Sequence, residues 1–179
     1  DWSSVRYILF RTIWDYFDRF DEFAPWLDRV SAITRMINPP GIIHWNIDKF
    51  YLKELYQKGI AIPPTVFIEK GANSSLREVT RPLGWDEYIL KPAVSGAARH
   101  TYRIPADRLD EFEGIFSELA GAERMLLQQF QKNILDKGEV AFMVFGGKFS
   151  HAVLKKAKPG DFRVQDDFGG TVYSYTPDK

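Results

Sequence analysis

The stretch MLLQQFQKNILDKGEVAFMVFGGKFSHAVLKKAKPGDFRVQDDFGG, residues 125–170, decides the fold. Residues 125–127 are apolar and predict a strand, which a polar loop follows. Residues 140–145 are apolar at both alternating positions, which predicts a strand covered on both faces. Gly146-Gly147 predicts a tight turn into a second strand over residues 148–154. The stretch therefore predicts a strand, a loop and an antiparallel hairpin.

Charged residues are unevenly placed around this hairpin. A single acid, Glu139, precedes it, while Lys155, Lys156, Lys158 and Arg163 lie on the return strand and the loop beyond it. The whole chain is neutral, with 24 Lys and Arg against 24 Asp and Glu, so this local excess of positive charge stands out. It indicates a site for an anionic ligand.

The composition excludes several classes of protein. With 179 residues and 45% hydrophobic residues, the chain is long and apolar enough to form a packed core. Zero net charge disfavours nucleic acid as the main partner. The chain has no cysteine, which excludes disulfides and thiolate chemistry and fits a cytoplasmic protein. No apolar run is long enough to span a membrane, so no membrane association is expected.

The remaining elements are predicted from periodicity and from breaker residues. Residues 5–10 predict a short strand, and apolar residues at helical spacing predict a helix over residues 21–33. Asn-Pro-Pro-Gly at residues 38–41 predicts a break. Asn46 is a suitable N-cap for a helix that ends near Lys58.

Further along, three short strands and a helix are predicted before residue 125. The strands cover residues 65–69, 88–90 and 101–104. A helix then begins at Pro105 and extends through apolar positions at helical spacing to Leu119. The pattern is that of an α+β protein without internal repeats.

The order strand, Gln-Gln-Phe, loop, Gly-Glu, hairpin, Lys-Lys, Gly-Asp-Phe-Arg and Gly-Gly resembles the nucleotide-binding half of the ATP-grasp ligases, in the glutathione synthetase and RimK-like branch. SHAVLK at residues 150–155 and GDFRVQ at residues 160–165 look most like the cycloserine-pathway ATP-grasp ligases. The resemblance implies an α+β ATP-grasp fold with antiparallel sheets and flanking helices. Residues 1–45 would then be the end of a preceding α/β domain, and residues 46–179 a partial nucleotide-binding domain.

The resemblance gives phosphate-binding roles to Lys49, Lys91 and Ser95. Lys49 lies about three residues into the helix predicted from Asn46, where the helix dipole disfavours a cation, and such a lysine is ordinarily solvated. Lys91 ends a predicted strand before Pro92, where a lysine is usually a solubilising charge. Ser95 opens a run of small residues that resembles a mobile flap over the triphosphate, although the run by itself is an ordinary turn.

The resemblance places the rest of the nucleotide on the 125–170 stretch. Gln128, Gln129 and Phe130 correspond to the segment that contacts adenine, although by themselves they are only a strand end. Glu139 corresponds to the acid that accepts hydrogen bonds from ribose hydroxyls. Similar ligases often carry an arginine two residues later, and here that residue is Ala141.

Two residues are predicted to be catalytic by the same resemblance. Arg163 matches the arginine that faces the γ-phosphate and the acyl-phosphate intermediate, where a guanidinium suits charge spread over several oxygens. Lys156 is the second candidate. His151 more often would be a satisfied strand histidine, and Arg11 and Asp15 are suggested only as residues of the acceptor site.

No metal ligands are predicted within the chain. The family's Mg²⁺ ligands, an acid followed by Glu and Asn, lie after the Gly-Gly region, and they are expected beyond Lys179. The chain is therefore interpreted as a fragment. ATP and Mg²⁺ are the expected cofactors of the full-length protein.

The predicted function is an ATP-dependent carboxylate–amine ligase that forms an amide through an acyl phosphate. Its partners would be a small carboxylate and an amine, and relatives suggest a homodimer by analogy alone. Two alternatives stay open at this point. One is a non-catalytic ATP-binding or regulatory module, motivated by Ala141 and the missing metal ligands. The other is an RNA-binding surface on the basic hairpin, residues 148–163, which zero net charge disfavours.

Overall fold

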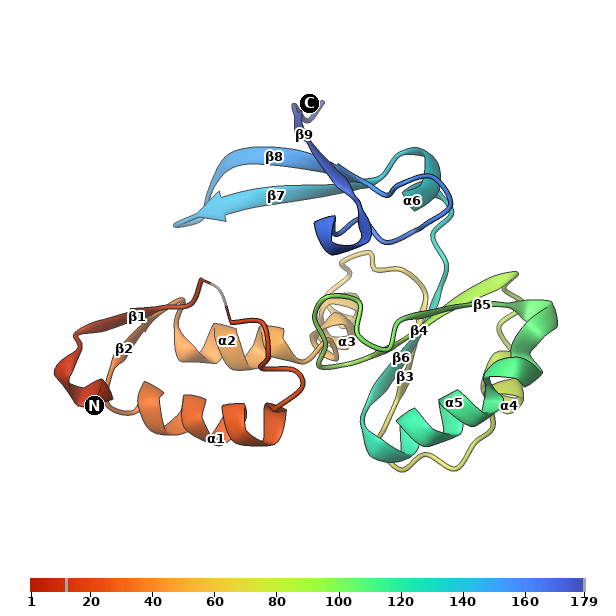
Figure 1. Ribbon diagram of the computed structural model, residues 1–179, viewed down its shortest axis with the longest axis horizontal. Coiled ribbons are helices and arrows are strands. Elements are labelled where there is room, and N and C mark those ends of the chain that lie inside the picture. Colours follow the sequence, from red (N-terminus) through yellow and green to blue (C-terminus); the bar gives the residue numbers. More distant parts are fainter. Residues whose placement is uncertain (12, 179) are drawn as a thin grey trace. The chain divides into compact units, whose positions relative to one another are not determined.

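The computed structural model describes residues 1–11 and 13–178. The chain separates into two compact units, Asp1–Gln129 and Phe130–Lys179, each with its own sheet structure (Figure 1). Three short 3-10 turns accompany the helices and strands: η1 (Trp2–Ser4), η2 (Ala106–Arg108) and η3 (Asp166–Phe168). In the part of the chain that the structure describes, every helix is too short or too polar to cross a bilayer.

The first unit opens with a parallel β–α–β arrangement. β1 (Tyr7–Leu9) and β2 (Arg35–Ile37) pair in parallel, and α1 (Phe20–Ser31) connects them. A helical crossover is the usual way to join parallel strands, and residues 7–37 form one such β–α–β unit. β2 was not predicted from the sequence. The core between α1 and the two strands consists of Ile8, Leu27, Val30 and Met36.

Two helices replace the single helix predicted from Asn46. α2 (Pro40–Ile47) begins at the proline pair, because proline suits the first helical position, where its missing N–H is not needed. The chain then turns at Asp48, whose carboxylate accepts a hydrogen bond from the Phe50 amide at 2.9 Å, and α3 (Tyr51–Gln57) follows. The predicted break is found at residues 38 and 39, between β2 and α2, but residues 40 and 41 are helical, and the prediction of an N-cap at Asn46 is wrong.

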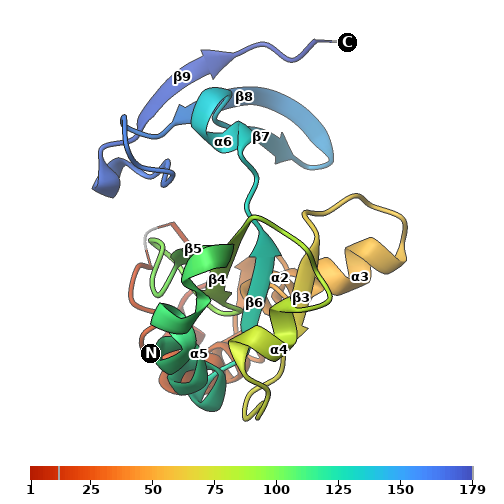
Figure 2. The same cartoon turned by 90° about the vertical axis from the view of Figure 1, so that its right-hand side faces the viewer.

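An antiparallel sheet of four strands forms the rest of the first unit. The strand order is β3 (Thr65–Ile68), β6 (Met125–Gln129), β4 (Glu87–Pro92) and β5 (Tyr102–Pro105). α4 (Leu76–Thr80) and α5 (Leu109–Ala122) cover one face, as Figure 2 shows. Helices and sheet enclose a core that includes Leu76, Leu90, Ile104, Phe116 and Leu127.

The two faces of this sheet differ because side chains alternate along a strand. On β4, Tyr88 and Leu90 point into the core beneath α4 and α5. Lys91 therefore points to the opposite face, and its register partner on β6 is Leu126. Phe50, just before α3, packs edge-on against Phe67 of β3, with ring centroids 5.2 Å apart. The face away from α4 and α5 thus carries Lys91.

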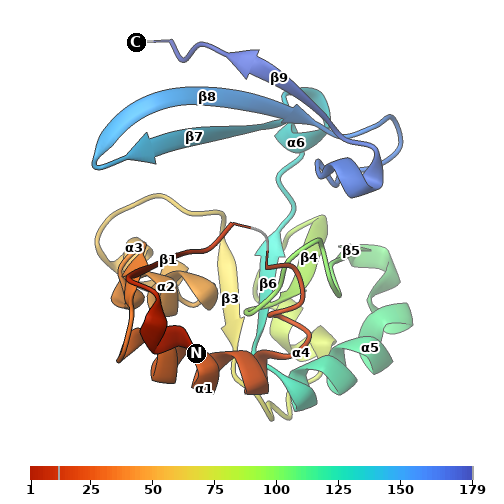
Figure 3. The same ribbon diagram turned by 60° about the vertical axis from the view of Figure 1, so that its left-hand side comes forward.

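The second unit is built on a three-stranded antiparallel sheet. Its order is β7 (Glu139–Phe145), β8 (Lys148–Lys156) and β9 (Thr171–Tyr175), with the one-turn helix α6 (Asn133–Asp136) before it. Figure 3 shows β7 and β8 as a long curved hairpin. Gly146 and Gly147 have φ of 56° and 76°, the left-handed values that a two-residue hairpin turn needs. The predicted hairpin is confirmed.

One prediction about this hairpin is wrong. Phe142, Val144 and Phe145 are 56%, 57% and 68% exposed, so β7 is not covered on both faces by the described residues. The apolar pattern identified a strand correctly, but burial also needs a second layer. Among residues 130–178 only the short α6 and η3 accompany the sheet.

Phe116 gives a test of the first unit's core. Its side chain is 1% exposed, and we expect Phe116→Ala to lower the free energy of unfolding by about 3–5 kcal/mol, because it removes buried apolar surface and leaves a cavity. Urea unfolding followed by circular dichroism measures this. Tyr56→Ala is the control, since Tyr56 is 68% exposed, and it should change stability by no more than about 0.5 kcal/mol. Equal losses in the two variants would contradict the described core.

Candidate functional site

Lys49 lies in the turn between α2 and α3, not inside a helix as predicted. Its backbone amide donates a hydrogen bond to the Ala93 carbonyl at 3.0 Å. Its ammonium group donates to the carbonyl oxygens of Ala93 and Ser95 at 3.2 and 2.9 Å. The lysine thus reaches across the unit and holds the segment that follows β4 by three hydrogen bonds.

The residues on either side of Lys49 fix this turn. Asp48 forms an ion pair with Arg124 at 2.5 Å. The Arg124 guanidinium also lies over the Phe50 ring, 4.7 Å from its centroid, within the range of a cation–π interaction. Both neighbours of Lys49 are therefore held by one arginine, and this arrangement directs the lysine toward β4.

The surroundings of Lys49 disfavour the charged form of its ammonium group. Burial lowers its pKa to about 8, because desolvation disfavours the charged form, and repulsion from Lys91 lowers it further. The negative charge of Asp48 acts in the opposite direction. Lys91 lies on the sheet face away from α4 and α5 and is close enough to Lys49 to lower its pKa by repulsion. Two partly buried like charges near one another are a favourable place for an anion.

The small-residue segment beginning at Ser95 has an unusual backbone. Ala97, Ala98 and His100 all have φ between 47° and 55°, a region that non-glycine residues rarely adopt. Gly96 leaves room for a neighbour, because a Cβ there would lie 2.5 Å from the Phe17 ring. The segment therefore fits closely against the loop between β1 and α1.

Arg99 anchors the end of the same segment. Its guanidinium forms ion pairs with Asp18 at 3.2 Å and with Glu123 at 3.0 Å. Ser95 contributes a hydrogen bond from its hydroxyl to the Arg99 carbonyl at 3.1 Å. The positive charge of Arg99 is thus balanced by two carboxylates within the unit, and Lys49 and Lys91 are the stronger candidates for holding an anion.

Gln128 and Gln129 end β6, the strand paired with both β3 and β4. Gln128 is buried, and its side-chain amide donates to the Thr65 hydroxyl at 2.8 Å. The backbone N–H of Gln129 donates to the Pro64 carbonyl at 2.9 Å. Both interactions connect β6 to the start of β3, so these residues have a structural role whatever they bind.

The predicted residues of the second unit lie at the ends of its strands. Phe130 is buried and packs edge-on against Phe162, with ring centroids 6.0 Å apart. Glu139, the first residue of β7, is about half exposed, and Lys155 of β8 donates to its carboxylate at 3.3 Å. Lys156 ends β8 and is exposed.

Arg163 is held by two neighbours in the second unit. Asp161 accepts hydrogen bonds from its side chain at 3.0 and 2.8 Å, and the guanidinium lies 3.7 Å from the centroid of the Phe168 ring. The side-chain hydrogen bond from Arg163 is the main cause that holds the pKa of Asp161 well below its usual range. The pair stays ionised at neutral pH, so the orientation of Arg163 is fixed.

The structure therefore brings Lys49, Lys91 and Ser95 together in the first unit. Glu139, Lys156 and Arg163 belong to the second unit. Sequence reasoning did not predict the tie between Lys49 and the Ser95 carbonyl, because two segments 46 residues apart meet there. It also placed no residue of α2 in the site.

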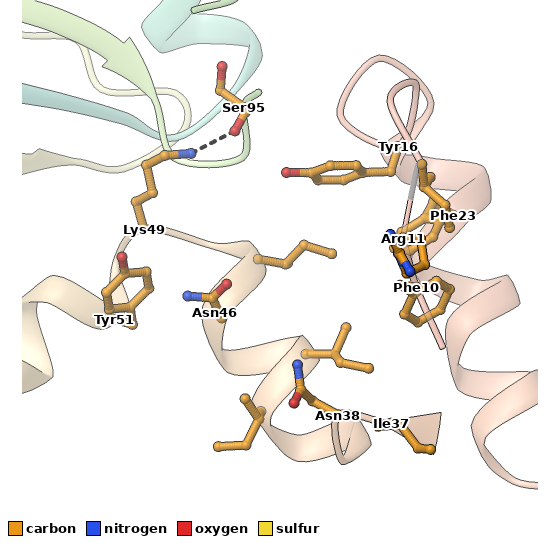
Figure 4. A pocket seen from close by; sticks show the side chains of 14 residues that line it. Phe10, Arg11, Tyr16, Phe23, Ile37, Asn38, Asn46, Lys49, Tyr51 and Ser95 are labelled. Carbon is orange, nitrogen blue, oxygen red and sulfur yellow. Dashed lines mark hydrogen bonds between the residues drawn. The ribbon is translucent and has the colours of Figure 1, made fainter. Parts of the chain in front are cut away.

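A pocket of about 440 Å³ lies next to Lys49 and Ser95 within the first unit. Figure 4 shows Lys49 and Tyr16 on its upper side and Arg11 beside Phe10 and Phe23 on the side of the β1 loop. Of the two residues suggested for an acceptor site, Arg11 lines this pocket. Asp15 does not, and instead forms an ion pair with Arg19 at 3.4 Å.

Tyr16, Asn38 and Asn46 also line the pocket, and none of them was predicted as a site residue. They come from the loop after β1, the end of β2 and the last turn of α2. No shared motif links these three positions in the sequence. The one available signal was the Asn-Pro-Pro-Gly break, which in the structure begins the helix that carries Asn46.

Comparison with known proteins finds similarity to proteins of cycloserine biosynthesis. Residues 1–38 match the family model of the N-terminal domain of the D-cycloserine synthetase DcsG. The chain is 29% identical over 167 residues to the cycloserine biosynthesis protein DcsG of Streptomyces lavendulae, covering 88% of this chain and 54% of that protein. The chain thus spans about half the length of this curated relative.

Solved structures agree with the sequence comparison. The crystal structure of D-cycloserine synthetase DcsG matches 98% of this chain and 62% of its own, with a TM-score of 0.86 and 27% identity. D-alanine–D-alanine ligase from Bacillus anthracis, complexed with ATP, matches 98% and 54% with a TM-score of 0.63 and 16% identity. ATP-grasp ligase PsnB, complexed with a precursor variant, Mg and ADP, matches 96% and 58% with a TM-score of 0.60 and 16% identity.

These findings confirm the α+β ATP-grasp fold predicted from the sequence. The matches below 25% identity support the fold, and the DcsG matches add similarity in sequence over most of the chain. The chain therefore has the ATP-grasp fold and is similar in sequence to the D-cycloserine synthetase DcsG.

Proposed function

We propose that the full-length protein is an ATP-dependent ligase that joins a small carboxylate to an amine through an acyl phosphate. The observation that carries the proposal is that Lys49 lies near a second positive charge, Lys91, and donates a hydrogen bond to the Ser95 segment. Relatives named as a ligase with bound ATP and as a biosynthetic synthetase support it. ATP supplies the phosphoryl group that activates the carboxylate.

The two lysines suit the phosphates of ATP for a physical reason. The buried ammonium of Lys49 lacks solvent, and Lys91 repels it, so bringing in phosphate oxygens relieves both penalties. Charge-assisted hydrogen bonds to phosphate are also stronger than neutral ones. Ser95 lies directly beside this position, because its carbonyl already accepts a hydrogen bond from Lys49.

The remaining roles are those that the resemblance implies, and they stay predictions. Gln128 and Gln129 at the end of β6, with Phe130, are the candidates for the base, and Glu139 is the candidate for the ribose. Arg163 and Lys156 remain the candidates for the charge that develops during phosphoryl transfer. The fixed orientation of Arg163 against Asp161 and Phe168 supports its role, since a preorganised guanidinium stabilises a transition state better than a mobile one.

Mg²⁺ is part of the proposal only through the relatives, one of which is complexed with Mg and ADP. Among residues 1–11 and 13–178, no three His, Asp or Glu side chains are grouped so as to hold a metal ion. Mg²⁺ as a cofactor stays a prediction. A cytoplasmic location and a homodimer stay predictions as well.

Lys91→Ala tests the nucleotide site. We expect the full-length variant to bind a non-hydrolysable ATP analogue about tenfold or more weakly, because one charge-assisted phosphate contact is lost. Isothermal titration calorimetry measures the affinity. Lys58→Ala is the matched control, since Lys58 is an exposed lysine at the end of α3, and its affinity should stay unchanged.

Unchanged affinity in Lys91→Ala would argue against the proposed site. The ligase activity is tested separately, by measuring whether ADP forms only when both a carboxylate and an amine are present. Binding of the ATP analogue without any ADP formation in the presence of both substrates would favour the alternative of a non-catalytic or regulatory module.

The lowered pKa of Lys49 predicts how nucleotide affinity depends on pH. Phosphate binds the protonated ammonium, so binding raises the pKa of Lys49 above its free value of about 8. Affinity should be full below that value and fall several-fold as the pH rises from about 7.5 to about 9.5. Calorimetry with the same ATP analogue across this range measures the change.

Lys49→Gln supplies the control for this pH dependence. The variant has no charge to titrate at this position, so it should bind more weakly than wild type near neutral pH and lose the fall in affinity above about pH 8. A fall that persists unchanged in Lys49→Gln would assign the titration to another group.

A further inference from the structure

The two residues between α5 and β6, Glu123 and Arg124, contact both segments of the proposed phosphate site. Glu123 forms an ion pair with Arg99, 3.0 Å away, near the end of the small-residue segment. Arg124 forms an ion pair with Asp48, 2.5 Å away, in the turn between α2 and α3. Sequence reasoning gave neither residue a role. The short link before β6 therefore holds both sides of the site.

The backbone of Ala93 connects this link to the Lys49 turn. Its N–H donates to the Arg124 carbonyl at 2.8 Å. Its carbonyl accepts hydrogen bonds from the Lys49 amide at 3.0 Å and from the Lys49 ammonium at 3.2 Å. Ala93 thus lies between Arg124 and Lys49, with hydrogen bonds to both. A displacement of the Arg124 backbone would therefore be passed on to the ammonium group.

The side chain of Arg124 makes a second connection to the same turn. Its partner Asp48 has a side chain that is only 19% exposed, so without the guanidinium a carboxylate would stay largely out of water with no counter-charge. The guanidinium also covers the ring of Phe50, and that ring packs against Phe67 of β3. One arginine thus fastens both neighbours of Lys49 to the sheet.

Arg124 is a poorer direct ligand for phosphate than Lys49. Its charge is already balanced by Asp48, and one face of its guanidinium lies on the Phe50 ring. The Lys49 ammonium instead donates to two neutral carbonyl oxygens, and burial lowers its pKa to about 8. An anion therefore stabilises Lys49 more than it stabilises Arg124. Any effect of Arg124 on nucleotide binding should pass through the lysine.

We propose that Arg124 is a positioning residue of the nucleotide site, which holds the Lys49 ammonium where the phosphates of ATP would bind. The inference rests on the proposed function and adds to it a residue that touches no phosphate. A charge held in its binding position in advance loses less freedom when the ligand arrives, so it contributes more to affinity. Loss of Arg124 should weaken nucleotide binding only as far as it releases Lys49.

The charges around Lys49 give this role an electrostatic signature. The titratable groups that lie around the ammonium, on its own turn and on neighbouring elements, are Asp48, Lys91, Arg11, Tyr16 and Tyr51. Asp48 raises the pKa of Lys49 and Lys91 lowers it. Removing the charge of Arg124 leaves Asp48 without its cation, which should raise the pKa of Lys49. Removing the charge of Asp48 should lower it.

A double-mutant cycle tests whether Arg124 acts through Lys49. Calorimetry near pH 7 measures how the full-length wild type, Arg124→Gln, Lys49→Gln and the double variant bind the non-hydrolysable ATP analogue. We expect Arg124→Gln to weaken binding about fivefold or more in the wild type, but less than about twofold when Lys49 is already replaced. Arg124→Lys keeps the charge and should recover part of the affinity.

The pH dependence of affinity separates positioning from general loosening of the turn. The fall in affinity above about pH 8 should move to higher pH in Arg124→Gln and to lower pH in Asp48→Asn. A turn that merely opens to solvent would move the fall upward in both variants. Arg77→Gln is the matched control, because Arg77 of α4 forms an exposed ion pair with Asp110 of α5 at 2.5 Å. It should keep the affinity and the pH profile of the wild type.

Four results would overturn the role of Arg124. They are unchanged affinity in Arg124→Gln, an equal loss with and without Lys49, an equal loss in Arg77→Gln, or shifts of the pH profile in the same direction in Arg124→Gln and Asp48→Asn. If the wild type binds the analogue and Lys91→Ala weakens it, such a result leaves the proposed function intact. A wild type that does not bind the analogue sinks the proposed nucleotide site and the inference together.

Thermal unfolding checks that each variant is folded. If Arg124→Gln does not fold, Asp48→Asn takes its place in the cycle, because it breaks the same ion pair from the other side and its amide oxygen can still accept the hydrogen bond from the Phe50 amide. The expected result and the contradicting result are then the same as for Arg124→Gln.

Discussion

A buried ammonium group holds the first unit's site together. Lys49 donates to two carbonyl oxygens of the segment after β4, and it does so from a turn fixed by Arg124. The group lacks solvent and lies near a second positive charge, so its pKa falls to about 8. A cation in this position is stabilised most by an incoming anion, because hydrogen bonds to neutral carbonyls compensate only part of its lost hydration.

The position of Lys91 follows from alternation along β4. Tyr88 and Leu90 point into the core beneath α4 and α5, so Lys91 must point to the other face. Packing of Tyr88 and Leu90 beneath the helices stabilises the strand, and the opposite face carries the charge of Lys91. One short strand thus packs against the core with one face and carries the charge of Lys91 on the other, and a register shift of one residue would exchange the two faces.

The segment from Ser95 to His100 joins the site to the N-terminal β–α–β segment. Phe17 fits against Gly96, and Asp18 pairs with Arg99. The same loop contributes Arg11 and Tyr16 to the pocket beside Lys49. The β–α–β segment therefore forms one wall of the pocket beside Lys49 and supports the segment that follows β4.

The sequence by itself determined the α+β class, the hairpin over β7 and β8, helix α5, the expected ATP-grasp fold and the choice of Lys49, Lys91 and Arg163 as candidates. These depend on local periodicity, on glycine turns and on the order of motifs, which are properties of neighbouring residues. Only the tertiary structure decided that Pro40 begins a helix, that Lys49 lies in a turn and that β7 is exposed. It alone brought Arg11, Tyr16 and Asn46 to one pocket, because contacts between distant segments depend on how helices and strands pack, and no local pattern encodes them.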